Sequence, residues 1–410
     1  MRSGIQGFQS QRLKQLRASA AMTQIELAER IQCVKGNISK WEQGKSSPEA
    51  SSFQKICDVF NVPSSWLMEE PIASPETHPS FFRAKNKTPK ISREIAKIRL
   101  DWAEEVSYKL QESLEFPDIN LPEYTGDFKV LTDYEIEDLA TECRQRWELG
   151  QRPIQNLINV MEGNGVVVTR GTLGFTKMDG VSRWSKIDSR PYVFLCMDKA
   201  NGFRARFDAG HELGHIVLHK KVTDAEYQKN YHLLENQAHR FASALLLPAS
   251  SFVRDVHYPT METFLALKPK WKVSVAAMIR RCQDLEVISD QTALRLWKAR
   301  SARGWTAREP LDDTLEPEEP KLLQRSIKML VENNILDKCT LRQMLGAPAH
   351  IIEELSNLPK NYFNQDQPDK VIELRIRNPS QQGQTTQQMG IKGRVIKLEQ
   401  RKVHHGMKDV

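Results

Sequence analysis

The sequence has no long apolar run. No stretch of its 410 residues approaches the roughly 20 apolar residues that a membrane-spanning helix needs. The N-terminal segment has neither an apolar core nor a small-residue cleavage pattern, so no secretion signal is indicated. We therefore expect a cytoplasmic protein that makes no contact with a membrane.

Cysteine is scarce, and its spacing argues against two further classes of protein. The six cysteines never form a C-x-x-C pair; they are Cys33, Cys57, Cys143, Cys196, Cys282 and Cys339. This scatter argues against a disulfide framework and a four-cysteine zinc site, and is typical of reduced thiols. The formal net charge of +7 permits contact with nucleic acid without establishing it.

Length and proline placement indicate several domains. A chain of 410 residues is long enough for about two to four separate cores. Residues 71–80 contain three prolines and no apolar period, so they read as a linker. Beyond them, apolar residues at helical spacing predict a long helix over residues 92–114.

The N-terminal region combines short helices with a tight turn. Apolar residues recur there at spacings of three and four, which is typical of several amphipathic helices around one core. Thr23 and Glu26 can form a capping box that starts a helix ending near Ile31. A second helix is predicted over residues 34–43, before Gly44. Two such helices with others packed behind them are the parts of a helix-turn-helix domain.

A closer resemblance rests on three motifs in this region. They are Met22-Thr23-Gln24-x-x-Leu27-Ala28, Ile38-Ser39-Lys40-Trp41-Glu42-x-Gly44 followed by Pro48, and Asn61-Val62-Pro63-x-x-Trp66-Leu67. In combination they resemble the Cro/cI-type (XRE) family of phage repressors. The resemblance implies an all-α domain whose second motif helix enters the major groove of a double-stranded DNA operator.

The resemblance also implies candidate DNA contacts. The contacts to bases or phosphates would be Lys35, Gly36, Asn37 and Lys40, and the contact to the DNA backbone would be Gln24. Lysine suits a phosphate or guanine, and asparagine suits adenine. Residues 1–70 hold nine Lys or Arg against seven Asp or Glu, so we expect firm binding to need a homodimer. The alternative, a bundle whose polar faces bind protein, stays open.

A second organised region is centred on residues 208–219, which read as a helix containing H-E-x-x-H. His211 and His215 lie one turn apart on the same helix face, so their imidazoles can converge on one Zn²⁺. Glu212 would then stand beside the metal-bound water as the general base of a metallopeptidase. A catalytic Zn²⁺ keeps three protein ligands and one open position, so a third ligand must come from elsewhere.

The following helix, predicted over residues 234–247, supplies a candidate third ligand. Its apolar positions form one buried face, and Glu235 lies at the N-terminal extension of that face. A carboxylate there is costly unless it is paired or metal-bound. Glu235 is therefore the preferred third ligand, which makes a gluzincin-like His₂Glu site.

Three strands are predicted before the H-E-x-x-H helix, at residues 165–169, 180–184 and 190–196. A strand at the sheet edge beside such a helix can hold an extended peptide by main-chain hydrogen bonds. We expect Tyr192–Cys196 to be that edge strand. Cys196 could cap the metal as an inhibitory thiolate, or be a buried strand cysteine.

Two motifs together carry a family resemblance over about residues 125–305. They are His211-Glu212-x-x-His215-x-x-x-His219 and Glu235-x-x-Ala238-x-x-Phe241-Ala242-x-x-Leu245-Leu246-x-Pro248. They resemble the ImmA/IrrE family of zinc metallopeptidases, which implies His211, His215 and Glu235 as Zn²⁺ ligands and Glu212 as the general base. Where that family commonly carries asparagine two residues before the Phe-Ala pair, this chain has His239.

Three other side chains near these motifs allow two interpretations each. His219 competes as a ligand, but one rigid helix seldom offers three histidines to one ion, so a supporting or core position is preferred. Tyr231 and His232 either stabilise an oxyanion or occupy a loop.

Together these features predict a multidomain, mainly α protein. A helix-turn-helix bundle is followed by an α+β zincin-like peptidase domain with a small sheet, and by a helical C-terminal region. The expected domains are residues 1–70 for DNA binding, 71–125 for a linker and connecting helix, 126–305 for the peptidase, and 306–410 for a helical and extended region. In the last, residues 322–345 predict helices, and residues 371–376 and 394–398 predict a hairpin.

The function expected from these parts is that of a DNA-binding transcriptional regulator with zinc endopeptidase activity. The family resemblance implies a substrate that is itself a helix-turn-helix repressor, cleaved to derepress stress, mobile-element or defence genes. The chain itself is another candidate substrate. The alternative is a non-proteolytic repressor whose peptidase-like domain senses a ligand or metal.

Overall fold

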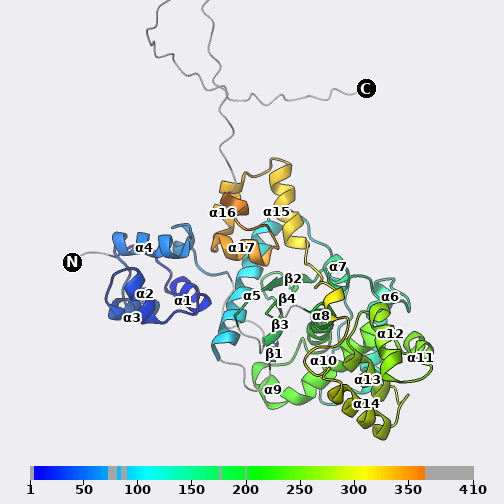
Figure 1. The fold of residues 1–410 in the computed structure, drawn as a ribbon. Coiled ribbons are helices and arrows are strands. Elements are labelled where there is room, and N and C mark those ends of the chain that lie inside the picture. The colour runs from blue at the N-terminus through cyan, green and yellow to red at the C-terminus, as the bar shows by residue number, and fades with distance from the viewer. Residues whose placement is uncertain (1–3, 73–80, 85–89, 175–177, 199–200, 365–410) are drawn as a thin grey trace, which may run out of the picture. The chain divides into compact units, whose positions relative to one another are not determined.

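The computed structural model describes residues 4–72, 81–84, 90–174, 178–198 and 201–364, with main chain alone at residues 81–84 and 90 (Figure 1). The chain divides into two units after Phe363, and nearly all of the second lies outside the described residues. The hairpin expected at residues 371–376 and 394–398 therefore also lies outside them. Helices dominate the first unit, which confirms the predicted fold class.

Residues 4–72 form a bundle of short helices. These are α1 (Ser10–Ser19), α2 (Gln24–Arg30), α3 (Lys35–Glu42) and α4 (Ala50–Phe60), followed by the 3₁₀ turn η1 (Trp66–Met68). The predicted capping box starts α2, because the Glu26 N–H donates to Thr23 Oγ1 while the Glu26 carboxylate accepts from the Thr23 N–H. Leu16, Leu27 and Ile38 are fully buried in the core between the helices. The helix-turn-helix fold is thus confirmed.

The sheet has four strands in the order β1-β3-β4-β2. They are β1 (Phe81–Ala84), β2 (Val167–Gly171), β3 (Met178–Trp184) and β4 (Pro191–Cys196). β4 pairs in parallel with β2 and antiparallel with β3, and β1 pairs antiparallel with β3. Three of these strands match the predicted ones, whereas β1 was not predicted from the sequence.

The expectation that Tyr192–Cys196 forms the sheet edge is wrong. β4 lies between β2 and β3, and the edges of the described sheet are β1 and β2. Alternate residues of β4 explain this position: Tyr192 and Phe194 pack in one apolar cluster, whereas Val193 and Leu195 pack in another. A strand buried on both faces reads as a continuous apolar run, which is typical of the interior of a sheet.

Helices cover both faces of the sheet (Figure 1). Helix α5 (Lys90–Gln111) packs with the cluster on one face, and α8 (Gly202–Leu218) packs with the cluster on the other. Helix α10 (Tyr231–Leu246) lies along α8, and α6 (Asp133–Arg146) lies along α10. The helix with the H-E-x-x-H motif is therefore held between the sheet and α10.

The remaining helices complete the described chain. They are α7 (Leu157–Gly163), α9 (Asp224–Lys229), α11 (Ala249–Asp255), α12 (Met261–Trp271), α13 (Val275–Asp284), α14 (Asp290–Ala302), η2 (Asp312–Thr314), α15 (Leu322–Glu332), α16 (Lys338–Leu345), α17 (Ala349–Leu355) and η3 (Tyr362–Asn364). Glu162 on α7 accepts from the backbone N–H groups of Lys321 and Leu322, where α15 begins. Glu318 in turn accepts from the first two N–H groups of α7. Among the described helices, none is long and apolar enough to span a membrane.

Candidate metal centre

Helices α8 and α10 approach closely because α8 presents two glycines to α10. A side-chain carbon on Gly214 would lie 3.0 Å from the Cα and carbonyl oxygen of Ala238. A carbon on Gly210 would lie 3.4 Å from the Ala242 methyl group. These two small-residue contacts bring the side chains of the H-E-x-x-H motif within reach of α10.

His211, His215 and Glu235, the three predicted ligands, come together at this contact. The Nε2 atoms of the two histidines are 3.1 Å apart, and they lie 3.4 and 3.3 Å from the carboxylate oxygens of Glu235. Donors around a tetrahedral Zn²⁺, with bonds of about 2.0–2.1 Å, are separated by roughly 3.3–3.4 Å. Both imidazoles are fully buried, and Glu235 is also buried. The donor set and its spacing therefore fit a tetrahedral metal ion such as Zn²⁺.

A chain of hydrogen bonds behind the site orients His215. Gln237 Nε2 donates to the Phe128 carbonyl at 2.7 Å, which leaves Gln237 Oε1 to accept from His219 Nε2 at 3.0 Å. His219 Nδ1 can then accept from the Nδ1–H of His215 at 2.9 Å. The Nε2 lone pair of His215 remains directed toward Glu235. Burial lowers the pKa of His219 well below its usual range, which agrees with a neutral ring that supports a ligand.

Glu212 lies against strand β3. Ser182 Oγ donates to Glu212 Oε2 at 2.6 Å, and a carbon added to Gly180 would lie 2.9 Å from Glu212 Oε1. Gly180 and Ser182 are two residues apart, so both face α8. Glu212 is fully buried there, in a position that suits an oriented general base. Sequence reasoning missed Ser182, for which the alternation of small residues in β3 is the available signal.

Tyr227 on α9 contacts the predicted carboxylate ligand. Its hydroxyl donates to Glu235 Oε1 at 3.4 Å, and its ring lies edge-on to His215. Tyr231 and His232, the two residues predicted to stabilise an oxyanion or occupy a loop, lie in the first turn of α10. Tyr231 packs on Tyr227, and the exposed His232 packs on Tyr231. Tyr227, which sequence reasoning missed, thus touches two of the predicted ligands, Glu235 and His215.

Cys196 does not join the predicted ligands. It ends β4 and packs with the apolar cluster that includes residues of α5. Burial raises the pKa of its thiol well above the usual range, which disfavours the thiolate form that binds metals. The structure therefore favours the strand-cysteine interpretation over the inhibitory thiolate.

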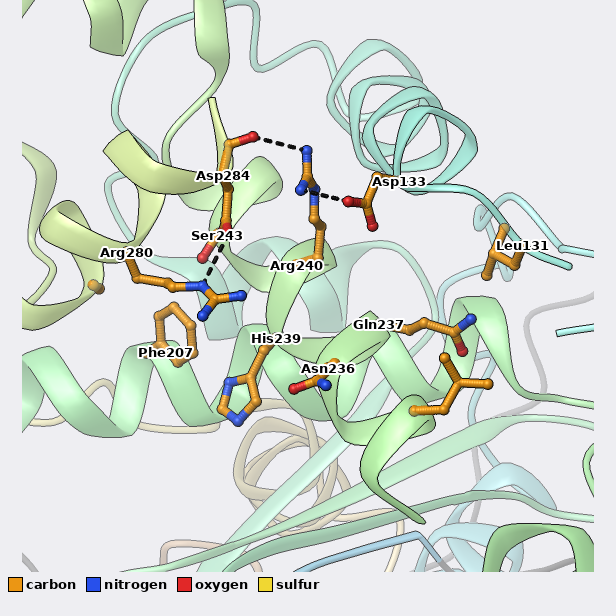
Figure 2. Close-up of a pocket in the computed structure, with 12 residues that line it drawn as sticks. Leu131, Asp133, Phe207, Asn236, Gln237, His239, Arg240, Ser243, Arg280 and Asp284 are labelled. Carbon is orange, nitrogen blue, oxygen red and sulfur yellow. Dashed lines mark hydrogen bonds and ion pairs between the residues drawn. The ribbon is translucent and has the colours of Figure 1, made fainter. Parts of the chain in front are cut away.

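His239 lies one turn beyond Glu235 on α10. The centroid of its ring is 4.4 Å from that of His211 and 5.8 Å from that of Phe207. Figure 2 shows His239 beside Phe207 at a cavity of about 470 Å³. The wall of this cavity also includes Asn236, Arg240, Ser243, Arg280 and Asp284. A second cavity of about 300 Å³ shares both His239 and Phe207, so His239 borders the two cavities and the predicted ligands together.

The residues predicted to contact DNA are distributed over two helices. Four of them are exposed on α3, namely Lys35, Gly36, Asn37 and Lys40. Gln24 on α2 is instead half-buried and donates to Glu42 Oε2 at 2.7 Å, a carboxylate that also accepts from Arg17. Helix α3 therefore presents a polar surface, whereas Gln24 braces α2 against α3.

Family models match both the helix-turn-helix region and the region of the predicted metal ligands. Residues 162–283 match the family model described as the IrrE N-terminal-like domain, of the M78 peptidases. Residues 13–67 match the family model described as helix-turn-helix. A search among curated proteins finds no match to the chain. The two predicted resemblances are confirmed, and the chain combines a helix-turn-helix domain with a domain of the M78 peptidase family.

Proposed function

We propose that this protein is a DNA-binding transcriptional regulator with zinc-dependent endopeptidase activity. The observation that carries the proposal is the donor triangle of His211, His215 and Glu235, with Glu212, the neighbour of His211 on α8, held against β3. The match to the M78 peptidases supports the enzymatic half. The helix-turn-helix match and the exposed polar residues of α3 support the DNA-binding half.

Glu212 is the proposed general base. When bound by the three ligands, Zn²⁺ would polarise the scissile carbonyl and acidify a water molecule. Glu212 takes a proton from the attacking water on its carboxylate and later delivers it to the leaving amine. Ser182 keeps one carboxylate oxygen oriented during both transfers, and burial of the pair excludes competing bulk water.

Two further side chains hold the ligands in place. His219 accepts from His215 Nδ1 and so fixes the tautomer in which Nε2 of His215 carries the lone pair that a metal ligand needs. Tyr227 donates to one oxygen of Glu235 and restricts rotation of that carboxylate. Such outer contacts usually change metal affinity about 10- to 100-fold when they are removed.

The proposed substrate is a helix-turn-helix repressor, whose cleavage would derepress stress, mobile-element or defence genes. The family resemblance supports this choice, as does the presence of a domain of the same kind in this chain. DNA bound through α3, by a homodimer in our proposal, would place the peptidase near repressors on neighbouring operators.

The chain itself is a second substrate within this proposal. β1 (Phe81–Ala84) belongs to the segment between the two matched domains, and Arg83 pairs with Gly180 of β3. Gly180 packs against Glu212, so the main chain of β1 runs one strand away from the proposed general base. Extended peptides often bind by such edge pairing. Cleavage near β1 would separate the DNA-binding domain from the peptidase domain.

The test compares the wild type with Glu212→Gln, which keeps the size of the side chain but cannot accept the proton. Both proteins are assayed for zinc content and incubated with candidate helix-turn-helix repressors and alone. We expect cleavage by the wild type only, with equal zinc content, and mass spectrometry would locate each cut. Zinc-loaded wild type that cuts neither repressors nor itself, yet binds DNA, would contradict the endopeptidase and favour the sensing repressor.

A further inference from the structure

Helix α10 carries two potential metal ligands. Glu235 and His239 are four residues apart on α10, just as His211 and His215 are four residues apart on α8. Side chains at this spacing share a helix face. The two neighbouring helices therefore each present a pair of donors to the same space.

The ring of His239 is directed to the site by its neighbours. One ligand atom from each of His211, Glu235 and His239 lies within 4.8 Å of the other two. The ring lies between His211, which it meets at an interplanar angle of 58°, and Phe207, on which it stacks at 30°. His239 is half-buried whereas His211 and Glu235 are buried, so it occupies the cavity side of the group.

We propose that His239 is a fourth, displaceable ligand of the metal, an inference that rests on the proposed metal site. Four protein ligands make a closed, structural site, whereas three leave the position that peptide hydrolysis needs. Because His239 borders both cavities and its ring lies against His211, a peptide that enters either cavity would meet this ring before the other three ligands. His239 thus closes the resting site, and substrate opens it by taking the position of the imidazole.

The test uses the full-length protein loaded with Zn²⁺ or Co²⁺. His239→Asn removes the imidazole but keeps a polar side chain, and His257→Asn, at an exposed histidine that is not among the donors, is the matched control. Competition with a chelator should show an affinity for Zn²⁺ at least about tenfold lower in His239→Asn and unchanged in His257→Asn. Millimolar azide should alter the visible absorption of Co²⁺-loaded His239→Asn and leave that of the wild type unchanged, since the variant alone has an open position.

Two outcomes overturn the inference in different ways. Equal Zn²⁺ affinity and an equal response to azide in the wild type and His239→Asn would remove His239 from the ligand set and leave the three-ligand site intact. Wild type that binds neither Zn²⁺ nor Co²⁺ would overturn the proposed metal site, and this inference with it. His239→Gln serves as a second variant, and circular dichroism of the metal-free proteins verifies that each is folded.

Discussion

Ser182 on β3 donates a hydrogen bond of 2.6 Å to the carboxylate of Glu212 on α8. Both residues are fully buried, so the bond is shielded from water. Hydrogen bonds to an ionised carboxylate are shorter and stronger than those between neutral groups. The orientation of the proposed general base therefore depends on the sheet as well as on its own helix.

Replacement of Ser182 by alanine should slow peptide cleavage without loss of metal. A hydrogen bond to a charged group contributes about 1.5–3 kcal/mol, so we expect kcat to fall about 10- to 100-fold. Ser185→Ala is the control, since Ser185 is buried just beyond β3 and its hydroxyl accepts a local hydrogen bond from the Ile187 N–H. An unchanged kcat in Ser182→Ala would contradict the positioning role.

Gly214→Ala should separate α8 from α10. The added methyl would lie 3.0 Å from the main chain of Ala238, which cannot give way as a flexible side chain can. Overpacking of this kind costs about 1–3 kcal/mol, so thermal unfolding should occur at a lower temperature and zinc affinity should fall. Gly36→Ala on α3 has no atom within 4 Å of the new methyl and should unfold at the wild-type temperature or slightly above. Wild-type stability and affinity in Gly214→Ala would show that the helices tolerate a wider spacing.

Removal of the metal should lower the melting temperature of the wild type. A ligand that binds only the folded state stabilises it by about 4 kcal/mol at a thousandfold excess over its dissociation constant. Glu235→Ala loses one of the proposed ligands and should bind zinc more weakly than the wild type, so a chelator should change its melting temperature less. Glu262→Ala, at an exposed glutamate on α12, should behave as the wild type does. Wild-type zinc affinity in Glu235→Ala, measured by competition with a chelator, would exclude Glu235 from the ligand set.

Asn37→Ala combined with Lys40→Ala should abolish the gel shift of DNA from upstream of the protein's own coding sequence. A good contact to a base favours the correct base over a wrong one by about 1–3 kcal/mol. Loss of one phosphate contact reduces the slope of log K against log salt concentration by about one. Lys14→Ala changes an exposed lysine on α1 and should leave binding intact. Unaltered binding by the double variant would rule out the groove assignment of α3.

The stability of the protein should fall as pH rises toward 7. Burial raises the pKa of Glu162 from an ordinary value of 4.5 to about 7, against the hydrogen bonds from Lys321 and Leu322. Between pH 4.5 and pH 7 the folded state binds more protons than the unfolded state. The stabilisation that protonated Glu162 gives the folded state is therefore complete below about pH 4.5 and is lost as pH passes 7. The difference corresponds to about 3 kcal/mol. Denaturant titrations at several pH values should show this slope in the wild type and a flatter one in Glu162→Gln; equal slopes would exclude Glu162 as its source.

Features set by local spacing were predictable from the sequence. The capping box of Thr23 and Glu26, the pairing of His211 with His215 and the apolar face of α10 each depend on residues within one or two turns. The position of Glu235 beside the two histidines was predictable for a related reason. A carboxylate at the end of the buried face of a helix is costly unless a charged group or a metal pairs with it.

Contacts between distant segments were not predictable in this way. Ser182 meets Glu212 across 30 residues of sequence, and Gln237 bonds to the Phe128 carbonyl across 109. β4 was wrongly predicted at the sheet edge because its pairing with β2 on one side and β3 on the other is set by the tertiary structure. β1 was missed because residues 81–84 are a short run that carries no strong strand signal. Its pairing with β3 depends on the return of a distant segment to the sheet.

The sequence by itself determined that two domains are joined, and that His211 and His215 share one face of one helix with Glu212 beside them, because helical periodicity is a local property. The tertiary structure decided which residues meet them. Glycines on α8 let α10 approach closely enough for Glu235 and His239 to enter the same space, and β3 laid Ser182 on Glu212. Such contacts arise from the packing of helices and strands that are remote in the chain, and no local pattern encodes them.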